Sequence, residues 1–246
     1  MKKKHLVTRR KALVAIGSLG ALLLPACGKK VPPTYGNILR MGDALTYNAH
    51  RTLLPEQALA PEYTAADISS FPATGTTNPG DPSLRTYSKE YEAFQQTAFT
   101  HWKLPIEGKV ERPGAFTLSE LKAMPSRTQI TRHLCEEGWS AIAEWTGVPL
   151  SIVLQQAGVL PAARFVNFYA YDGYMESIDM LDAMHPQTIL AYVMNGRELP
   201  LQHGAPVRLR VERQVGYKSV KYLQRIVVSD EFVDMGDTGW SWYVGI

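Results

Sequence analysis

Cysteine is scarce in this sequence, and its scarcity limits the sites that the chain can build. The 246 residues contain only Cys27 and Cys135. Exported proteins that rely on disulfides pair their cysteines, and Cys27 lies in a segment with the features of an export signal. Cys135 then stands alone in the folded part of the chain. Such a cysteine is buried and inert, reactive, or a metal ligand, and all three roles stay open at this point.

Clusters of histidine are also missing. The six histidines stand at positions 5, 50, 101, 133, 185 and 203, whereas a structural zinc site needs four protein ligands, commonly Cys and His at close spacing. The pattern therefore argues against a zinc site of that kind. His133 lies two residues before Cys135 on an expected strand, so the two side chains could share a face. A nucleophilic cysteine needs such a histidine, and this alternative stays open.

Long apolar runs are missing too. The N-terminal apolar run covers about residues 12–26, fewer than the roughly 20 residues that span a membrane as a helix. It follows Arg9 and Arg10, which predicts a twin-arginine signal over residues 1–27 and a periplasmic protein. The run ends in Leu-Pro-Ala-Cys27, which is typical of a lipoprotein cleavage site. A lipid anchor on Cys27 is therefore the alternative to ordinary cleavage nearby.

The excess of positive charge is confined to this signal. Without residues 1–26 the chain has 20 basic and 23 acidic side chains. No basic stripe remains, which argues against a nucleic-acid partner. The remaining length and composition suffice for one globular core.

The rest of the chain divides into a linker with an N-terminal wrapping segment, expected at 28–100, and a domain core at 101–246. The wrapping segment contains the turn cluster SSFPATGTTNPGDP at 69–82. So long an irregular stretch is uncommon in a compact domain unless it covers the surface or builds a site. The core reads as α+β, mainly β with short helices. Helices are expected at 87–99, 117–124 and 149–157, and strands at 102–110, 127–134, 163–171, 188–196, 206–212 and 222–228.

Two long blocks carry a resemblance to a known family. Residues 131–150 contain Cys135, then Gly138-Trp139-Ser140 and then Trp145-Thr-Gly-Val-Pro-Leu150, and residues 177–228 form the second block. Together they resemble the molybdopterin-binding domain of the sulfite oxidase superfamily, most closely the exported bacterial branch that includes methionine-sulfoxide reductases. The resemblance implies a single domain of that fold, a molybdenum-molybdopterin cofactor and two-electron oxygen-atom transfer. It also implies that Cys135 is the protein ligand to molybdenum.

The resemblance implies further site residues. The expected cofactor contacts are His203, Arg208, Ser219, Val220 and Lys221, with Asn48, His50 and Arg51 from a shorter N-terminal match. Tyr174 matches an active-site tyrosine that could donate a hydrogen bond to an oxo ligand or to substrate. The alternative for Tyr174 is an ordinary packed aromatic side chain.

The residues after Cys135 depart from the sulfite oxidase pattern. Sulfite oxidases have arginines there, whereas this chain has Glu136 and Glu137. Sulfite is close to a dianion at neutral pH, so carboxylates beside the metal favour a neutral or zwitterionic S- or N-oxide as substrate. Positive charge from Arg127, Arg132 or Lys218 would weaken this expectation if those side chains faced the site.

Two alternatives to an oxide reductase follow from the same residues. One is a sulfite-oxidising dehydrogenase, and the other is a cofactor-free binding lipoprotein with the same fold. The sequence has no Cys-x-x-Cys-His haem-attachment motif. We therefore expect electrons to be exchanged with a separate haem protein in or near the membrane. The length of the chain leaves no room for the extra dimerisation domain of the larger sulfite oxidases, so we also expect a monomer.

Overall fold

The computed structural model describes residues 41, 45, 48–49, 51–53 and 58–231. Contacts divide the chain into two units, 1–38 and 39–246, and all described residues belong to the second. The expected signal segment, Cys27 and His50 therefore lie outside the described residues. Among the residues described, no helix combines the length and the apolar character needed to cross a membrane.

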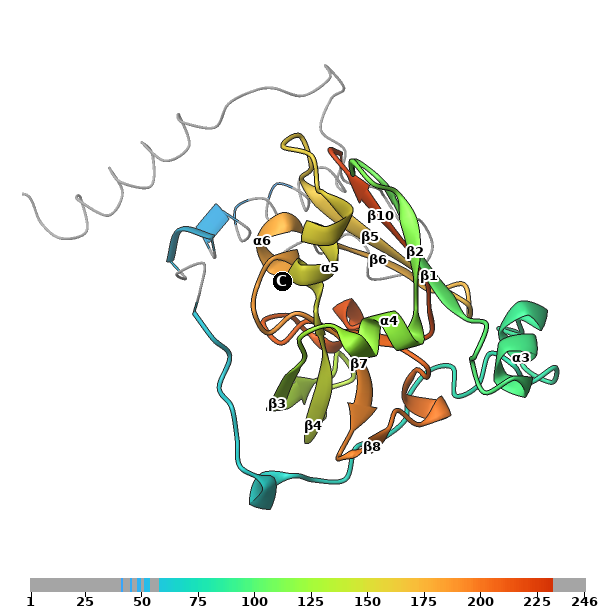
Figure 1. Cartoon of the computed structure of the whole chain (residues 1–246). Helices are drawn as coiled ribbons and strands as arrows, with labels where there is room; N and C mark the ends of the chain where they lie inside the picture. Colours follow the sequence, from blue (N-terminus) through green and yellow to red (C-terminus); the bar gives the residue numbers. More distant parts are fainter. Residues whose placement is uncertain (1–40, 42–44, 46–47, 50, 54–57, 232–246) are drawn as a thin grey trace, which may run out of the picture. The chain divides into compact units, whose positions relative to one another are not determined.

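The first of two five-stranded sheets pairs the start of the core with its end (Figure 1). Its strands, in spatial order, are β2 (Gly114–Thr117), β1 (Lys103–Gly108), β10 (Leu223–Ser229), β5 (Phe165–Ala170) and β6 (Met175–Asp179). Strands β1 and β10 run parallel, and the other neighbours are antiparallel. Strand β6 lies at the edge of this sheet, and Tyr174 immediately precedes it.

The second sheet positions Cys135. Its strands are β3 (Arg127–Leu134), β4 (Ser140–Pro149), β7 (Ile189–Met194) and β8 (Arg197–Glu198), with β9 (Arg208–Arg210) paired to β7. Strands β3 and β4 pair in continuous register up to Leu134 and Ser140. The loop between them is closed by the amide of Cys135, which donates to the carbonyl of Trp139 at 2.9 Å. Cys135 is thus held at the end of a long hairpin.

Short helices connect the strands. They are α3 (Lys89–Gln96), α4 (Leu118–Ala123), α5 (Leu150–Ala157), α6 (Met180–Ala183) and the 3₁₀ turns η1 (Ala65–Asp67), η2 (Leu201–His203) and η3 (Gly216–Lys218). Thr117 and Glu120 form the reciprocal capping box of α4, and Gly158, at φ 71°, ends α5. Helix α3 is shorter than expected because Ala98 and Phe99 adopt positive φ values of 48° and 60°.

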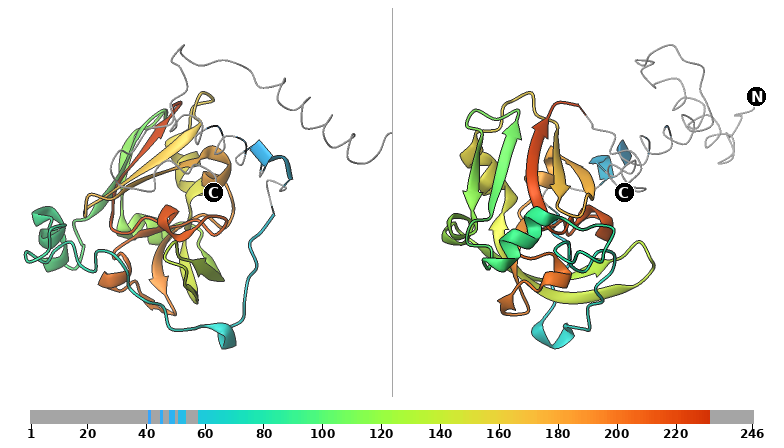
Figure 2. Two further views of the ribbon diagram at one scale, coloured as in Figure 1. Left: turned by 180° about the vertical axis from the view of Figure 1, so that it is seen from behind. Right: turned by 90° about the vertical axis from the view of Figure 1, so that its right-hand side faces the viewer.

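The main core lies between the two sheets. One cluster joins buried side chains of both sheets and of α5, including Ile106, Leu154, Phe168 and Leu190. Burying a side chain of this size stabilises the fold by roughly 1.5–3 kcal/mol. Figure 2 shows the same two sheets from behind and from the side. The expected α+β fold, mainly β with short helices, is confirmed.

A smaller cluster covers the other face of the second sheet. Successive residues of a strand point to opposite faces, and in β7 Leu190 belongs to the main core while Ile189 and Ala191 belong to the smaller cluster. Trp145 is the largest member of this cluster, and Phe71 packs against it. The N-terminal segment therefore reaches the sheet face that carries Trp145.

Candidate active site

A cavity of about 420 Å³ brings the expected site residues together. Its wall includes Cys135, Tyr174, His203, Arg208, Ser219, Val220 and Lys221. These residues come from the β3–β4 loop, the turn before β6, η2, β9 and the segment that follows η3. Its volume lies within the range of about 300–1,000 Å³ that is common for ligand and cofactor sites.

Cys135 is a buried thiol with two carboxylates beside it. Its side chain is 8% exposed, and Sγ lies 3.7 Å from Oε2 of Glu136 and 3.9 Å from Oε2 of Glu137. Burial is the main cause that raises the pKa of the thiol to about 11, and the two carboxylates raise it further. Without a bound cation the group is a thiol at neutral pH, so it lacks the thiolate character of a reactive cysteine.

His133 cannot serve as the base for that thiol. Its Nδ1 lies 2.9 Å from the guanidinium of Arg210. A guanidinium can only donate, so Nδ1 accepts and Nε2 carries the proton of the neutral ring. Burial, followed by Arg210 and Arg208, lowers the pKa of His133 to about 2. The alternative of a Cys–His nucleophile is therefore wrong.

Arg208 places a buried positive charge in the cavity wall. Its two terminal nitrogens donate to the carbonyls of His203 and Ser219, each at 3.0 Å. Its guanidinium also lies over the ring of Trp145, 5.1 Å from the centroid. Burial, and then the neighbouring Arg210, lowers the pKa of Arg208 to about 9. The charge of Arg210, in contrast, is neutralised by Glu212, whose carboxylate oxygen lies 2.8 Å from a guanidinium nitrogen of Arg210.

The donors of this wall fit an anionic cofactor. Nε of Arg208 is buried and lacks a hydrogen-bond partner among the described residues. No described carboxylate forms an ion pair with Arg208 either. A buried charge is costly unless it is paired, so the wall is suited to the phosphate that ends a molybdopterin. The single thiol of Cys135 in the same cavity suits a soft metal that receives its other sulfur ligands from the cofactor.

The segment 71–76 also lines the cavity, and its residues were not among those predicted for the site. The ring of Phe71 packs edge-on against His203 and Trp145, with centroids 5.5 Å apart in each pair. Nζ of Lys221 donates to the carbonyls of Thr74 at 2.8 Å and Thr76 at 2.5 Å. The irregular stretch at 69–82 was the sequence feature that pointed to this segment. It predicted a segment that covers the surface or builds a site, but not which of its residues line the cavity.

Tyr174 lies at the cavity with its ring packed against the main core, and its role toward an oxo ligand or substrate stays a prediction. It lines the cavity, and its hydroxyl donates to the carbonyl of Tyr217 at 2.9 Å. Burial raises its pKa. Asp172, a second unpredicted residue of the wall, accepts the amide of Tyr174 at 3.1 Å.

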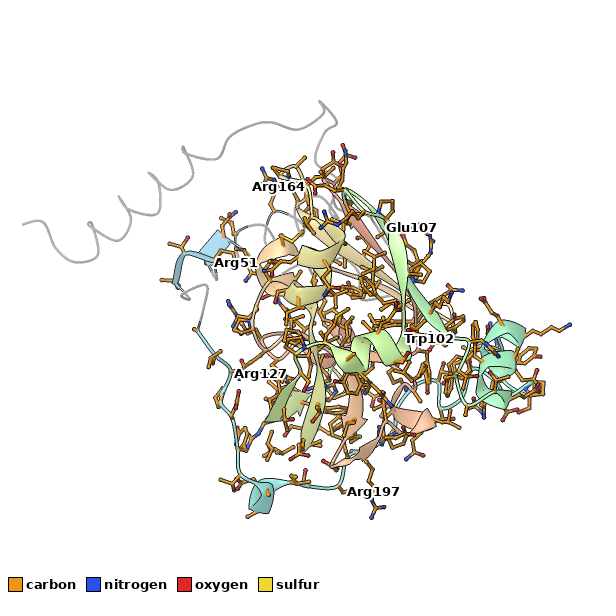
Figure 3. The ribbon with its side chains drawn as sticks, in the orientation of Figure 1. Arg51, Trp102, Glu107, Arg127, Arg164 and Arg197 are labelled. Atoms are coloured by element: carbon orange, nitrogen blue, oxygen red, sulfur yellow. The ribbon has the colours of Figure 1, made fainter. Side chains whose placement is uncertain are left out.

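The three basic residues that would weaken the carboxylate argument do not line the cavity. Arg127 (Figure 3) begins the edge strand β3, and its guanidinium pairs with the carboxylate of Glu62. Arg132 lies over the ring of Tyr63, 5.1 Å from its centroid. Lys218 is buried, and its Nζ lies 2.8 Å from the carboxylate of Glu176.

The N-terminal match is not brought to this cavity. Arg51 lies beside α6 (Figure 3), where its guanidinium is 2.8 Å from a carboxylate oxygen of Asp179 and of Asp182. Neither Arg51 nor Asn48 belongs to the cavity wall. Their role in cofactor binding, like that of His50, stays a prediction.

Residues 91–235 match the family described as oxidoreductase molybdopterin binding domain. The chain is 41% identical over 146 residues to the "Putative protein-methionine-sulfoxide reductase subunit YedZ1" of Azospira oryzae, covering 58% of this chain and 56% of that protein. It is 34% identical over 166 residues to the protein-methionine-sulfoxide reductase catalytic subunit MsrP of Xanthomonas campestris, covering 61% of this chain and 50% of that protein. The MsrP of Pseudomonas syringae is 32% identical over 194 residues, which is 72% of this chain and 55% of that protein.

The chain thus spans about half the length of these curated relatives. A solved structure, the sulfane dehydrogenase SoxCD from Paracoccus pantotrophus, has a TM-score of 0.52 at 20% identity, covering 85% of this chain and 58% of that chain. At this identity the likeness shows the fold alone. The family match covers more than half of the chain and includes the cavity residues from Cys135 to Lys221. The chain therefore belongs to the sulfite oxidase family of molybdopterin-binding oxidoreductases, and it is an enzyme with that cofactor.

Proposed function

We propose that this chain is an exported molybdenum-dependent reductase that removes the oxygen atom from an S- or N-oxide with electrons from a separate redox partner. The observation that carries the proposal is the pair of carboxylates, Glu136 and Glu137, in the cavity wall beside the Cys135 thiol. A carboxylate about 6 Å from an anion costs roughly 3 kcal/mol at an effective dielectric constant near 20. A neutral oxide avoids that cost.

The cations of the cavity wall support the same substrate class. Arg208 and Lys221 are the only Arg or Lys residues among the described lining residues, and both donate to backbone carbonyls. If Arg208 also holds the cofactor phosphate, little positive charge remains for a sulfite dianion. The cavity can then accept an uncharged sulfoxide or N-oxide more readily than sulfite.

The bound cofactor would supply the two-electron chemistry, which converts an oxide, two protons and two electrons into the deoxygenated product and water. The chain's own residues hold and orient the reactants. Cys135 would bind the metal through its sulfur after losing its proton. His203, Arg208, Ser219 and Val220 would hold the pterin and its phosphate. Tyr174 stands in the wall as a polar group that could orient the substrate, once its hydroxyl turns from the carbonyl of Tyr217.

Export and partnership complete the proposal. Arg9 and Arg10 before the apolar run support twin-arginine export into the periplasm, and the sequence Leu-Pro-Ala-Cys27 supports a lipid anchor on a membrane surface through Cys27. The relatives are named as a subunit and as catalytic subunits of reductases, which supports a separate electron donor. We propose a monomer served by a haem-containing membrane subunit or cytochrome.

The test is a paired steady-state assay on the molybdenum-loaded protein. Sulfoxides and N-oxides are offered with a reduced dye as donor, and sulfite is offered with ferricyanide as acceptor. We expect oxide turnover and little sulfite oxidation. Protein from a host that cannot make molybdopterin is the matched blank. A kcat/KM for sulfite above about 10⁴ M⁻¹s⁻¹, in the ordinary enzyme range, together with no oxide turnover, would favour the sulfite-oxidising dehydrogenase instead.

A further inference from the structure

The cavity has one wall that comes from outside the segment matched by the family. We call residues 71–76 the strap. All six residues line the cavity, although the family match begins only at residue 91. Within the described residues, no backbone–backbone hydrogen bond involves the strap, and it has no helix or strand. Its position must therefore depend on side chains.

Lys221 provides the main polar attachment of the strap. Its Nζ donates to the carbonyls of Thr74, Thr76 and Gln202, at 2.8, 2.5 and 3.3 Å. An ammonium group has three donors, so all three are used on the main chain. Such charge-assisted bonds are stronger than neutral ones. The lysine thus ties the strap to the loop that carries His203.

The surroundings are built for this lysine. Gly204 has a φ of 109°, and a Cβ at that position would lie 2.9 Å from the Cβ of Lys221, so glycine leaves room for the lysine stem. The neighbouring Tyr222 donates its hydroxyl to the carbonyl of Thr76 at 2.9 Å. Lys221 is half-buried, and this burial lowers its pKa to about 8.

The other end of the strap is attached by packing. Phe71 contacts four rings, with centroid distances between 5.1 and 5.8 Å: His133, Trp139, Trp145 and His203. Trp139 closes the loop of Cys135 through its carbonyl. The strap therefore touches both the metal-ligand loop and the expected pterin-binding histidine.

We propose that Lys221 is a positioning residue whose ammonium group fastens the strap over the cofactor cavity, so that release of the strap sets how fast the cofactor enters and leaves. This differs from the role implied by the family resemblance, in which Lys221 contacts the cofactor itself. The inference depends on cofactor binding in the cavity, but not on which oxide is reduced.

The test uses Lys221→Met, which keeps the length of the stem and removes the donors. Two readouts are followed: the rate at which molybdenum leaves the loaded protein in the presence of a chelator, and proteolytic nicking between residues 69 and 77, mapped by mass spectrometry. We expect both rates to rise by about tenfold or more, as the loss of a charge-assisted hydrogen bond predicts. Lys109→Met, which removes an exposed lysine paired with Asp230, should change neither.

Two further variants keep the proposal testable. Lys221→Arg should recover part of the protection, because a guanidinium can still donate to the strap carbonyls. Tyr222→Phe removes a single bond to Thr76 and should give a smaller effect, which covers the case in which Lys221→Met fails to fold. Nicking is also measured on protein made without cofactor. Faster molybdenum loss with unchanged nicking in that form would mean that Lys221 holds the cofactor directly, and would overturn the proposal. Neither readout uses turnover. A failure of this inference can therefore be told apart from a failure of the proposed reductase activity.

Discussion

Arg208 shows how one side chain can serve both the fold and the site. Two of its nitrogens bridge the carbonyls of His203 and Ser219, which belong to the two segments expected to hold the pterin. Its Nε is left for another acceptor. The residue therefore fixes the geometry of its neighbours while it presents charge to the cavity.

Replacing Arg208 by alanine should lower cofactor occupancy. Loss of a charge-assisted bond costs about 1.5–3 kcal/mol, so the affinity should fall about tenfold or more. The free energy of unfolding should also fall, because two buried carbonyls lose their donors. Molybdenum content is measured under limiting cofactor, with exposed Arg112→Ala as the control. Full loading of the alanine variant would show that the phosphate is held elsewhere.

The site residues predicted from long contiguous motifs come together at the cavity, and their roles there stay predictions. Cys135, Arg208 and the run 219–221 were all expected, and all line the cavity. The strap was not predicted, because the bond that Nζ of Lys221 donates to the carbonyl of Thr74 joins positions 147 apart, and no local pattern encodes such a pair. The prediction for Arg51 was based on a short match to the family. Its ion-pair partners, Asp179 and Asp182 at the start of α6, are also far away in sequence.

At the scale of elements, the β3–β4 hairpin and η3 meet at one point beside the site. A Cβ at Gly216, the first residue of η3, would lie 2.4 Å from Cε1 of His133. His133 is not free to move, because Arg210 binds its Nδ1 and Phe71 packs on its ring. The glycine thus allows the segment that leads to residues 219–221 to approach the end of β3.

Gly216→Ala should therefore push these two elements apart. Overpacking of this kind costs about 1–3 kcal/mol, and the free energy of unfolding should drop by that amount in denaturant titrations. Cofactor loading should fall as well. Gly114→Ala on β2 is the matched control, because a Cβ there meets nothing within 4 Å. Equal stability of the two variants would contradict the close approach.

Elements with local signals were predictable, and elements stabilised by distant partners were not. The capping box at Thr117 and the strand at 127–134 were read directly from the sequence. Strand β6 was missed because it contains charged residues such as Glu176, which suggest exposure. Glu176 is in fact buried and neutralised by Lys218, 42 residues away. Strand β4 was also missed, since Gly147 interrupts its β-forming pattern where the backbone of Leu190 comes close.

At the scale of the whole molecule, the fold and the family agree. Two sheets enclose the main core, and the family match covers residues 91–235. Membership in a cofactor-binding oxidoreductase family removes the cofactor-free binding lipoprotein from the alternatives. The oxide substrate, the export route and the redox partner rest on the proposal above.

The most direct test of the central claim is the sulfur coordination of molybdenum, measured by X-ray absorption at the molybdenum edge on wild-type protein and on Cys135→Ser. A neutral hydroxyl is a poor replacement for a thiolate, so the variant should lack turnover, while the pterin can still bind through Arg208 and its neighbours. We predict that the variant loses one sulfur ligand relative to wild type and keeps the sulfurs that the cofactor brings. An unchanged number of sulfur ligands, or wild-type rates in the variant, would contradict the assignment of Cys135 as the metal ligand.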